Sequence, residues 1–135
     1  MSGFQLDPRL EADSLPVADL GLCALRLMND QRFPWLLLIP RRVDKDEVLD
    51  LMEQDQKMLW DEVRRVARVL RSVYAPAKLN IAALGNQVRQ LHVHIIVRFE
   101  DDAAWPKPVW GIGATEPYPD PAAVIARLRL AMNSA

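Results

Sequence analysis

Two apolar runs separated by a short polar stretch are the first ordered pattern along this chain. Residues 20–28 read LGLCALRLM, and residues 33–40 read FPWLLLIP, with a proline near each end of the second run. Runs of this length and composition favour β-strands. The polar residues 29–32, NDQR, are typical of a turn because Asn and Asp side chains bond to nearby backbone. The pattern predicts an antiparallel hairpin.

One long helix is predicted over residues 44–74. Asp44 and Glu47 have the spacing of a capping box at its start, and Ala75-Pro76 ends it because proline cannot continue a helix. Apolar residues recur between these ends at spacings of three, four or seven, as on one buried helix face. They are Leu49, Met52, Leu59, Val63, Val66, Leu70 and Val73, and the opposite, solvated face carries Asp61, Arg64, Arg65, Arg68 and Arg71.

The second half of the chain returns to strands and turns. Residues 78–84 and 88–98 are predicted strands, joined by a glycine-led turn at 85–87. Residues 101–119 contain two Trp and four Pro and predict a loop. A short helix follows, from Asp120-Pro121 to about residue 132, because Asp is a good N-cap and Pro suits the first helical position. The order of elements predicts an α+β fold with an antiparallel sheet.

Composition and charge limit the class of protein. The 135 residues are 50% apolar with a net charge of −1, which predicts one domain over 1–135. Its last part, 101–135, contains the Trp/Pro-rich segment and the short helix. The absence of a basic stripe argues against nucleic acid as a partner, and no apolar run reaches the roughly 18 residues that span a membrane. Cys23 is predicted to be buried and reduced. Since residues 1–19 lack the apolar core of a signal peptide, we expect a cytoplasmic protein.

Both histidines of the chain lie two residues apart in the last predicted strand, as His92 and His94. Residues i and i+2 of a strand point to the same face, so the two imidazoles are predicted to lie side by side, with Gln90 next to them. Imidazole titrates near neutral pH and serves as nucleophile, base or metal ligand. The segment is therefore the leading candidate for a functional site.

Three interpretations of this pair remain open from the residues alone. The histidines can be structural, with their ring nitrogens satisfied by hydrogen bonds in the core. They can be metal ligands, but a closed site needs three or four ligands, and the sequence offers no third histidine and only a distant Cys23. They can act in covalent catalysis, in which a neutral imidazole attacks phosphorus while the turn Gly85-Asn86-Gln87 supplies donors to the phosphate oxygens.

The segment from Gly85 to Ile96, GNQVRQLHVHII, resembles the signature of the histidine triad (HIT) family of nucleotide hydrolases and transferases. That signature is His-φ-His-φ-His-φ-φ, with φ apolar, after a Gly-Gln-Ser/Thr turn. The preceding hairpin and long helix are also in the family's order, so the resemblance covers roughly residues 20–100. It implies a HIT-like α+β fold with a five-stranded antiparallel sheet, one long helix and a short C-terminal helix.

The resemblance implies a role for each residue that matches the motif. His92 matches the middle histidine, the nucleophile. His94 matches the third, which contacts the phosphate and whose backbone carbonyl would orient His92. Asn86 and Gln87 match the turn residues that contact the phosphate or the leaving group. Gln90 stands where the first histidine is found, and Asn86 and Gln87 also depart from the usual Gln and Ser/Thr.

The hairpin is implied to hold the nucleoside. Asn29 or Asp30 would accept hydrogen bonds from the ribose hydroxyls, and Asp30 is favoured because a carboxylate can pair with both. The base would lie in an apolar cleft against Leu27, Phe33 or Ile39.

As a whole, the resemblance implies an enzyme that acts at the α-phosphate of a nucleoside phosphoramidate or dinucleoside polyphosphate through a nucleotidyl-His92 intermediate. Diadenosine polyphosphate hydrolase and phosphoramidase activities are both of this kind. No metal and no cofactor is implied, and the nucleotide substrate is the expected partner together with a second copy of the chain in a homodimer. The alternative is a nucleotide-binding or sensing protein with little turnover, which the substitutions Gln90 and Asn86 suggest.

Overall fold

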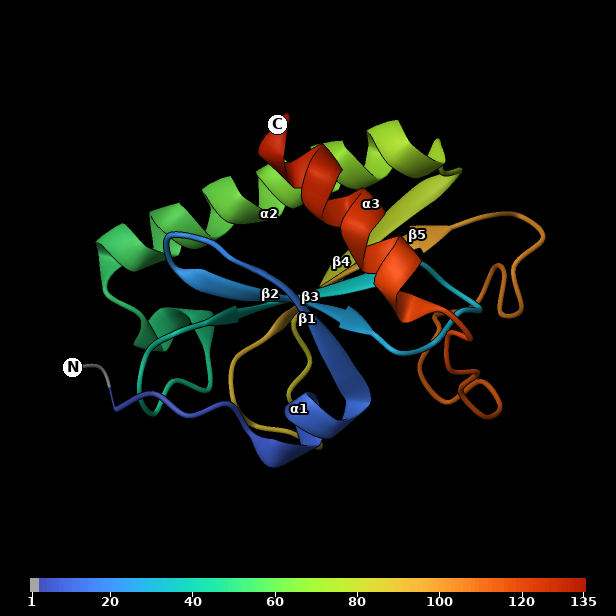
Figure 1. Ribbon diagram of the computed structural model, residues 1–135. Coiled ribbons are helices and arrows are strands. Elements are labelled where there is room, and N and C mark those ends of the chain that lie inside the picture. The colour runs from blue at the N-terminus through green and yellow to red at the C-terminus, as the bar shows by residue number, and fades with distance from the viewer. Residues whose placement is uncertain (1–2) are drawn as a thin grey trace.

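The computed structural model describes residues 3–135 and contains one five-stranded antiparallel sheet (Figure 1). The strands are β1 (Ser14–Asp19), β2 (Cys23–Met28), β3 (Trp35–Pro40), β4 (Lys78–Ala82) and β5 (Val93–Arg98). Their order across the sheet is β1-β2-β3-β5-β4, so β2, β3 and β5 lie inside and β1 and β4 form the edges.

Helices cover the sheet unequally. The long α2 (Glu53–Tyr74) and the C-terminal α3 (Pro121–Asn133) lie together over one face, and the short α1 (Pro8–Asp13) lies on the other side of the sheet (Figure 1). A single turn of 3-10 helix, η1 (Val48–Asp50), precedes α2. Among the described residues, no helix is both long and apolar enough to cross a bilayer.

Strand β5 shows how the two faces differ. Val93, Ile95 and Val97 pack into the core under α2 and α3, and we call this side the helix face. His94 and Ile96 alternate with them and point to the other side, the loop face, whose apolar cluster is covered by the N-terminal segment and by the loop after β5. Because both faces are covered, every residue of β3 and of β5 is buried.

The predicted hairpin is confirmed as β2 and β3, which pair in antiparallel fashion. The residue pattern did not predict β1 or α1, which precede it. Strand β1 pairs only with β2 and carries Pro16 next to an irregularity in the register. Proline cannot donate to a sheet and is tolerated at an edge, which explains both the position of β1 and its weak strand signal.

The predicted start of the long helix is wrong. Helix α2 begins at Glu53, not at Asp44, and Asp44 has a φ of 56°, a left-handed conformation that interrupts any helix there. The capping box is instead formed by Glu47 and Asp50 around η1. Leu49 is 85% exposed, so the apolar stripe of the buried helix starts later, at Leu59.

The other boundaries differ less. The end of α2 at Tyr74 is as predicted, with Ala75 in the left-handed conformation. Strand β4 ends at Ala82 and β5 begins only at Val93, so residues 83–92 form an extended connection that carries the first half of the motif. The C-terminal helix starts at its predicted cap, where the Asp120 side chain accepts a hydrogen bond from the Ala123 backbone N–H.

Candidate functional site

A cavity of about 600 Å³ opens on the loop face, at the start of β5. His92 and His94 both line it, as the strand parity predicts. The turn before the motif, the β2–β3 turn, α1 and the loop after β5 supply the rest. The lining residues are Leu10, Ala12, Asp13, Met28, Asn29, Trp35, Leu84, Gly85, Asn86, Gln87, Val88, His92, His94, Trp110, Gly111, Thr115 and Pro117.

The backbone fixes which nitrogen of His92 carries the proton. Its Nδ1 lies 2.6 Å from the carbonyl oxygen of Gln90. A carbonyl can only accept, so Nδ1 must be the protonated donor and Nε2 keeps a free lone pair. The ring is buried, with 7% of the residue exposed. The orienting carbonyl belongs to Gln90 and not to His94, which corrects the expectation drawn from the resemblance.

His94 is held in the opposite tautomer. The indole Nε1–H of Trp35 donates to Nδ1 of His94 at 3.0 Å. Since indole nitrogen is only a donor, Nδ1 of His94 must accept, and its proton lies on Nε2. Burial, and to a smaller extent the neighbouring His92, lower the pKa of His94 to about 3, so the ring stays neutral.

The two imidazoles form one unit with complementary chemistry. Their ring centroids are 4.9 Å apart in an edge-to-face arrangement. One ring offers a lone pair and the other offers an N–H donor at the same cavity. A nucleophile beside a donor suits attack on an electrophile that carries an anionic oxygen, such as a phosphate ester.

Two tryptophans support this pair. The Trp110 ring lies edge-on to His94 at 5.1 Å and to Trp35 at 6.0 Å between centroids. The loop that carries Trp110 is tied to β5 by the buried ion pair of Arg98 and Asp102, at 2.8 Å. The loop therefore packs against the site and restricts the orientation of His94.

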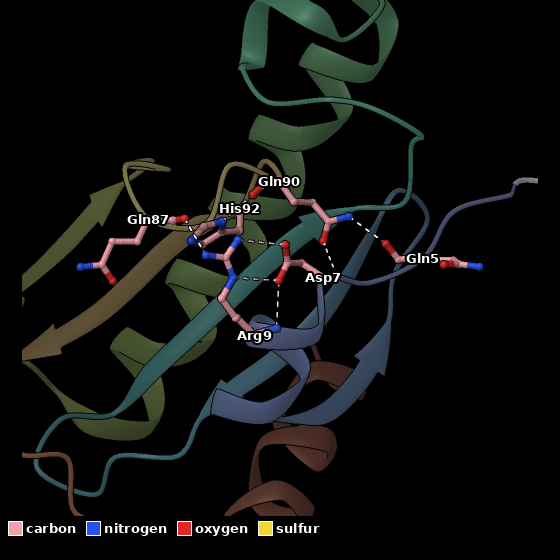
Figure 2. Close-up of polar contacts among 6 residues, drawn as sticks. All are labelled: Gln5, Asp7, Arg9, Gln87, Gln90 and His92. Carbon is pink, nitrogen blue, oxygen red and sulfur yellow. Dashed lines mark hydrogen bonds and ion pairs between the residues drawn. The ribbon is translucent and has the colours of Figure 1, made fainter.

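The Gln90 side chain does not join the histidines. Its Oε1 accepts from the Asp7 backbone N–H at 2.8 Å, and its Nε2 donates to the Gln5 carbonyl at 2.9 Å. Figure 2 shows the amide directed away from His92 and toward the N-terminal segment. The predicted shared face is wrong for Gln90 because β5 starts only at Val93, so strand alternation does not apply there. Gln90 contributes to the site through its carbonyl.

The turn before the motif lies at the rim of the cavity as predicted. Gly85 has a φ of 75°, which glycine adopts without strain. Asn86 and Gln87 follow it, both exposed and both lining the cavity. Their positions allow contact with a ligand above His92.

The β2–β3 turn departs from its prediction. Asp30 is fully buried and does not line the cavity, because its carboxylate binds the Arg32 guanidinium at 2.7 Å and accepts from the Glu116 backbone N–H at 3.3 Å. Burial alone would raise the pKa of Asp30, but these bonds keep it below its usual value. Asp30 is therefore a structural residue and is not free to accept from a ribose.

Asn29 does line the cavity, although its side-chain oxygen accepts from the Tyr118 backbone N–H at 2.9 Å. Asn29 and Asp30 together hold the segment around residues 112–118, which carries the lining residues Thr115 and Pro117. Asp13 from α1 places a carboxylate at the cavity, and the residue pattern did not indicate it because α1 was not predicted.

The apolar side of the cavity is also formed by residues other than those expected. Leu27, Phe33 and Ile39 are at most 1% exposed and belong to the core, so none can contact a base. Leu10, Met28, Leu84 and Val88 line the cavity instead. Within residues 3–135, no three His, Cys, Asp or Glu side chains gather in a way that could hold a metal ion.

A comparison with protein families matches residues 9–101 to the HIT domain. The chain belongs to the HIT domain family. Three HIT proteins of known structure resemble it over almost their full lengths. The protein from Sinorhizobium meliloti is 52% identical and has a TM-score of 0.91, and the match covers 93% of this chain and 95% of the Sinorhizobium chain. The five-stranded HIT-like fold implied by the motif is thus confirmed.

Two further HIT proteins are more distant in sequence and equally close in shape. The one from Bradyrhizobium japonicum is 44% identical, with 96% of this chain and 98% of its own covered and a TM-score of 0.93. The one from Marinobacter aquaeolei is 39% identical, with 97% of each chain covered and a TM-score of 0.94. A search of curated proteins found no match. The HIT match starts at residue 9, so it includes α1 after its first residue and all of β1, which lie before the segment that carried the resemblance.

Proposed function

We propose that this HIT protein is a nucleotide hydrolase or transferase that acts at the α-phosphate of a nucleoside phosphoramidate or dinucleoside polyphosphate. HIT proteins are typically nucleotide-binding hydrolases and transferases. His92 is the nucleophile, His94 is the donor to the phosphate, and Asn86 and Gln87 contact the phosphate or the leaving group. Asn29 and Asp13 face the nucleoside end of the cavity.

The observation that supports the proposal is the opposed protonation of the two rings. Gln90 O fixes the proton of His92 on Nδ1, and Trp35 fixes the proton of His94 on Nε2. A structural pair of histidines needs no such opposition, and a metal site would need lone pairs from both rings. A nucleophile and a neighbouring N–H donor are the two groups that displacement at phosphorus requires.

The proposed reaction has two displacements. The Nε2 lone pair of His92 forms a bond to the α-phosphorus, and the P–O or P–N bond to the leaving group breaks with its electron pair, which takes up a proton from water. The resulting imidazolium keeps Nδ1–H on the Gln90 carbonyl, which stabilises its positive charge. Water then attacks phosphorus, loses a proton to solvent, and returns the Nε2 electron pair to His92. The product is a nucleoside monophosphate.

A nucleotide-binding or sensing role with little turnover is the second candidate. It is favoured by the use of Gln90 to hold the N-terminal segment, since the first position of the motif is then committed to structure. Both candidates require a nucleotide in the cavity. Only the enzyme requires the lone pair of His92 to react.

The test is release of nucleoside monophosphate from a panel of diadenosine polyphosphates, adenosine phosphoramidate and an adenylated amine. We expect His92→Ala to lower the release rate by about a thousandfold or more, because the covalent step is lost. Nucleotide binding without release of nucleoside monophosphate would favour the second candidate. Equal release by native protein and His92→Ala would contradict the covalent mechanism. Exposed Arg89→Ala is the control for handling and folding.

We further propose that two copies of the chain form the homodimer that the resemblance implies. Strand β4 supports this because it lies at an edge of the sheet and pairs only with β5. Its Ile81 side chain is 44% exposed, which leaves an apolar group at that edge. Sedimentation equilibrium of native protein and of Ile81→Glu tests it, with a dimer expected for the first and a monomer for the second.

A further inference from the structure

The cavity beside His92 and His94 contains no cationic side chain. Among the residues that line it, no lysine or arginine is present, and Asp13 adds a negative charge. A phosphate chain carries several negative charges, and its binding sites usually include arginine or lysine. A ligand with a polyphosphate chain therefore needs a cation that lies just outside the lining.

Arg9 lies at that rim. One of its guanidinium nitrogens donates to the carbonyl oxygen of Gln87, a lining residue, at 2.9 Å. Figure 2 shows the guanidinium between Asp7 and Gln87, at the end of the site that carries His92. The chain folds back to achieve this, because Arg9 and Gln87 are 78 residues apart in sequence.

The Arg9 guanidinium is only loosely held. Its two bonds to the Asp7 carboxylate measure 3.4 and 3.5 Å, at the outer limit for a hydrogen bond. The Arg9 side chain is 61% exposed. Guanidinium has five N–H donors, and only the one that bonds the Gln87 carbonyl makes a short contact, so the others can bond a ligand once the long contacts to Asp7 are replaced. A phosphate can replace the weak contacts to Asp7 without breaking a buried ion pair.

The segment that carries Arg9 is itself fastened to the motif. The Gln90 side chain bonds to the backbone of Gln5 and Asp7, and the Asp7 carboxylate accepts from the Arg9 backbone N–H at 2.8 Å. The Arg9 backbone N–H and the Arg9 guanidinium lower the pKa of Asp7, so this carboxylate stays charged beside the guanidinium. The residue that replaces the first histidine of the motif thus positions a cation beside the nucleophile.

We propose that Arg9 binds the phosphate beyond the bond that His92 breaks, and so selects substrates with an anionic, phosphate-containing leaving group over those with a neutral amine. This inference rests on the proposed function for the location of the nucleotide, and it names the substrate class for that site. Arg9 is a specificity-determining residue in this proposal. A planar guanidinium can make two parallel bonds to a phosphate, which a neutral leaving group cannot accept.

The test is a binding measurement that needs no turnover. Calorimetry compares a nucleoside monophosphate with its non-hydrolysable α,β-methylene diphosphate, using adenosine and uridine as the nucleosides. We expect native protein to bind the diphosphate analogue about tenfold or more tightly than the monophosphate, the range for a hydrogen-bonded charge pair. Arg9→Ala should lose this preference while its monophosphate affinity stays native, and Arg9→Lys should keep part of it.

Arg89→Ala is the matched control. Arg89 is also exposed and next to the motif, but it pairs with Asp46 and does not line the cavity. It should keep the native preference. If Arg9→Ala weakens the binding of both ligands equally, Arg9 only holds the Gln87 turn. The proposal is also overturned if Arg9→Ala binds the diphosphate analogue as tightly as native protein does, or if native protein binds neither ligand. Failure of the proposed function is separate, because it would appear as absent turnover with the diphosphate preference intact.

Discussion

The two faces of strand β5 have different compositions and different covers. On the helix face, Val93, Ile95 and Val97 pack under regular helices in a cluster made of apolar side chains. On the loop face, His94 and Arg98 alternate with Ile96, and every polar side chain has a specific partner: Trp35 for His94 and Asp102 for Arg98. Arg98 is 2% exposed, and each of its guanidinium nitrogens donates a hydrogen bond, to Asp102, Asn80 or Lys107.

The difference shows where this fold separates stability from chemistry. Helices bury a large apolar area but offer few backbone groups to bond polar side chains, because their own N–H and C=O groups are paired. The irregular N-terminal segment and the loop after β5 have free backbone groups. Backbone groups of Gln5 and Asp7 bond the Gln90 side chain, and the Lys107 carbonyl accepts from the Arg98 guanidinium. The loop face can therefore hold the buried Arg98 and the Gln90 amide close to the two histidines.

The largest expected effect tests the helix face. Ile95→Ala should lower the free energy of unfolding by about 3 kcal/mol, because a fully buried side chain is replaced by a cavity. Turnover per folded molecule should stay native. Urea unfolding and active-fraction kinetics measure the two quantities. Leu130→Ala, on α3 and 71% exposed, is the control and should cost less than about 1 kcal/mol. A fall in turnover per folded molecule in Ile95→Ala would contradict the division between the faces.

An intermediate effect is expected for Trp35→Phe on the loop face. Phenylalanine keeps most of the ring but removes the N–H that fixes His94, so the His94 tautomers can exchange. We expect kcat to fall about tenfold, which corresponds to an increase of about 1.4 kcal/mol in the activation free energy, with a small change in KM. Nitrogen NMR of the imidazole should show a mixed protonation of His94 in the variant.

Trp60→Phe provides the comparison for this change, since Trp60 is 50% exposed on α2. It should alter neither kcat nor the His94 nitrogen shifts. If Trp35→Phe also leaves the nitrogen shifts unaltered, the indole does not set the tautomer, and the opposed protonation that supports the proposed function is lost.

The smallest effect is expected at Gln90, at the boundary between the motif and its cover. Gln90→Ala removes two hydrogen bonds to the N-terminal segment and should cost about 1 kcal/mol of unfolding free energy. Turnover of a phosphoramidate with a neutral amine leaving group, which does not need Arg9, should stay within about threefold of native in Gln90→Ala and in Gln90→His, because the group that orients His92 is the main-chain carbonyl. Limited proteolysis of the N-terminal segment reports its release. A tenfold fall in turnover with unchanged stability would mean that the Gln90 amide itself acts in the site.

Several elements could be predicted because their signals are local. The hairpin β2–β3 follows from two apolar runs and a turn, and α3 starts where Asp120-Pro121 predicts. The start of α2 could not be predicted, because Leu49 and Met52 fit the helical spacing but are 85% and 74% exposed. Spacing indicates which residues can share a face and does not indicate whether anything covers that face.

The sequence was sufficient to identify the two histidines and the turn before them, and the tertiary structure decided which other residues line the cavity and what each one contacts. His92 and His94 are identifiable because they are the two histidines of the chain and lie two apart. Their protonation depends on Gln90 O and on Trp35, which is 59 residues away from His94, and the role of Asp30 depends on Glu116. A tautomer, a buried ion pair or a rim cation such as Arg9 is set by its hydrogen-bond partner, and partners distant in sequence are brought together only by the register of the sheet and the path of its covering segments.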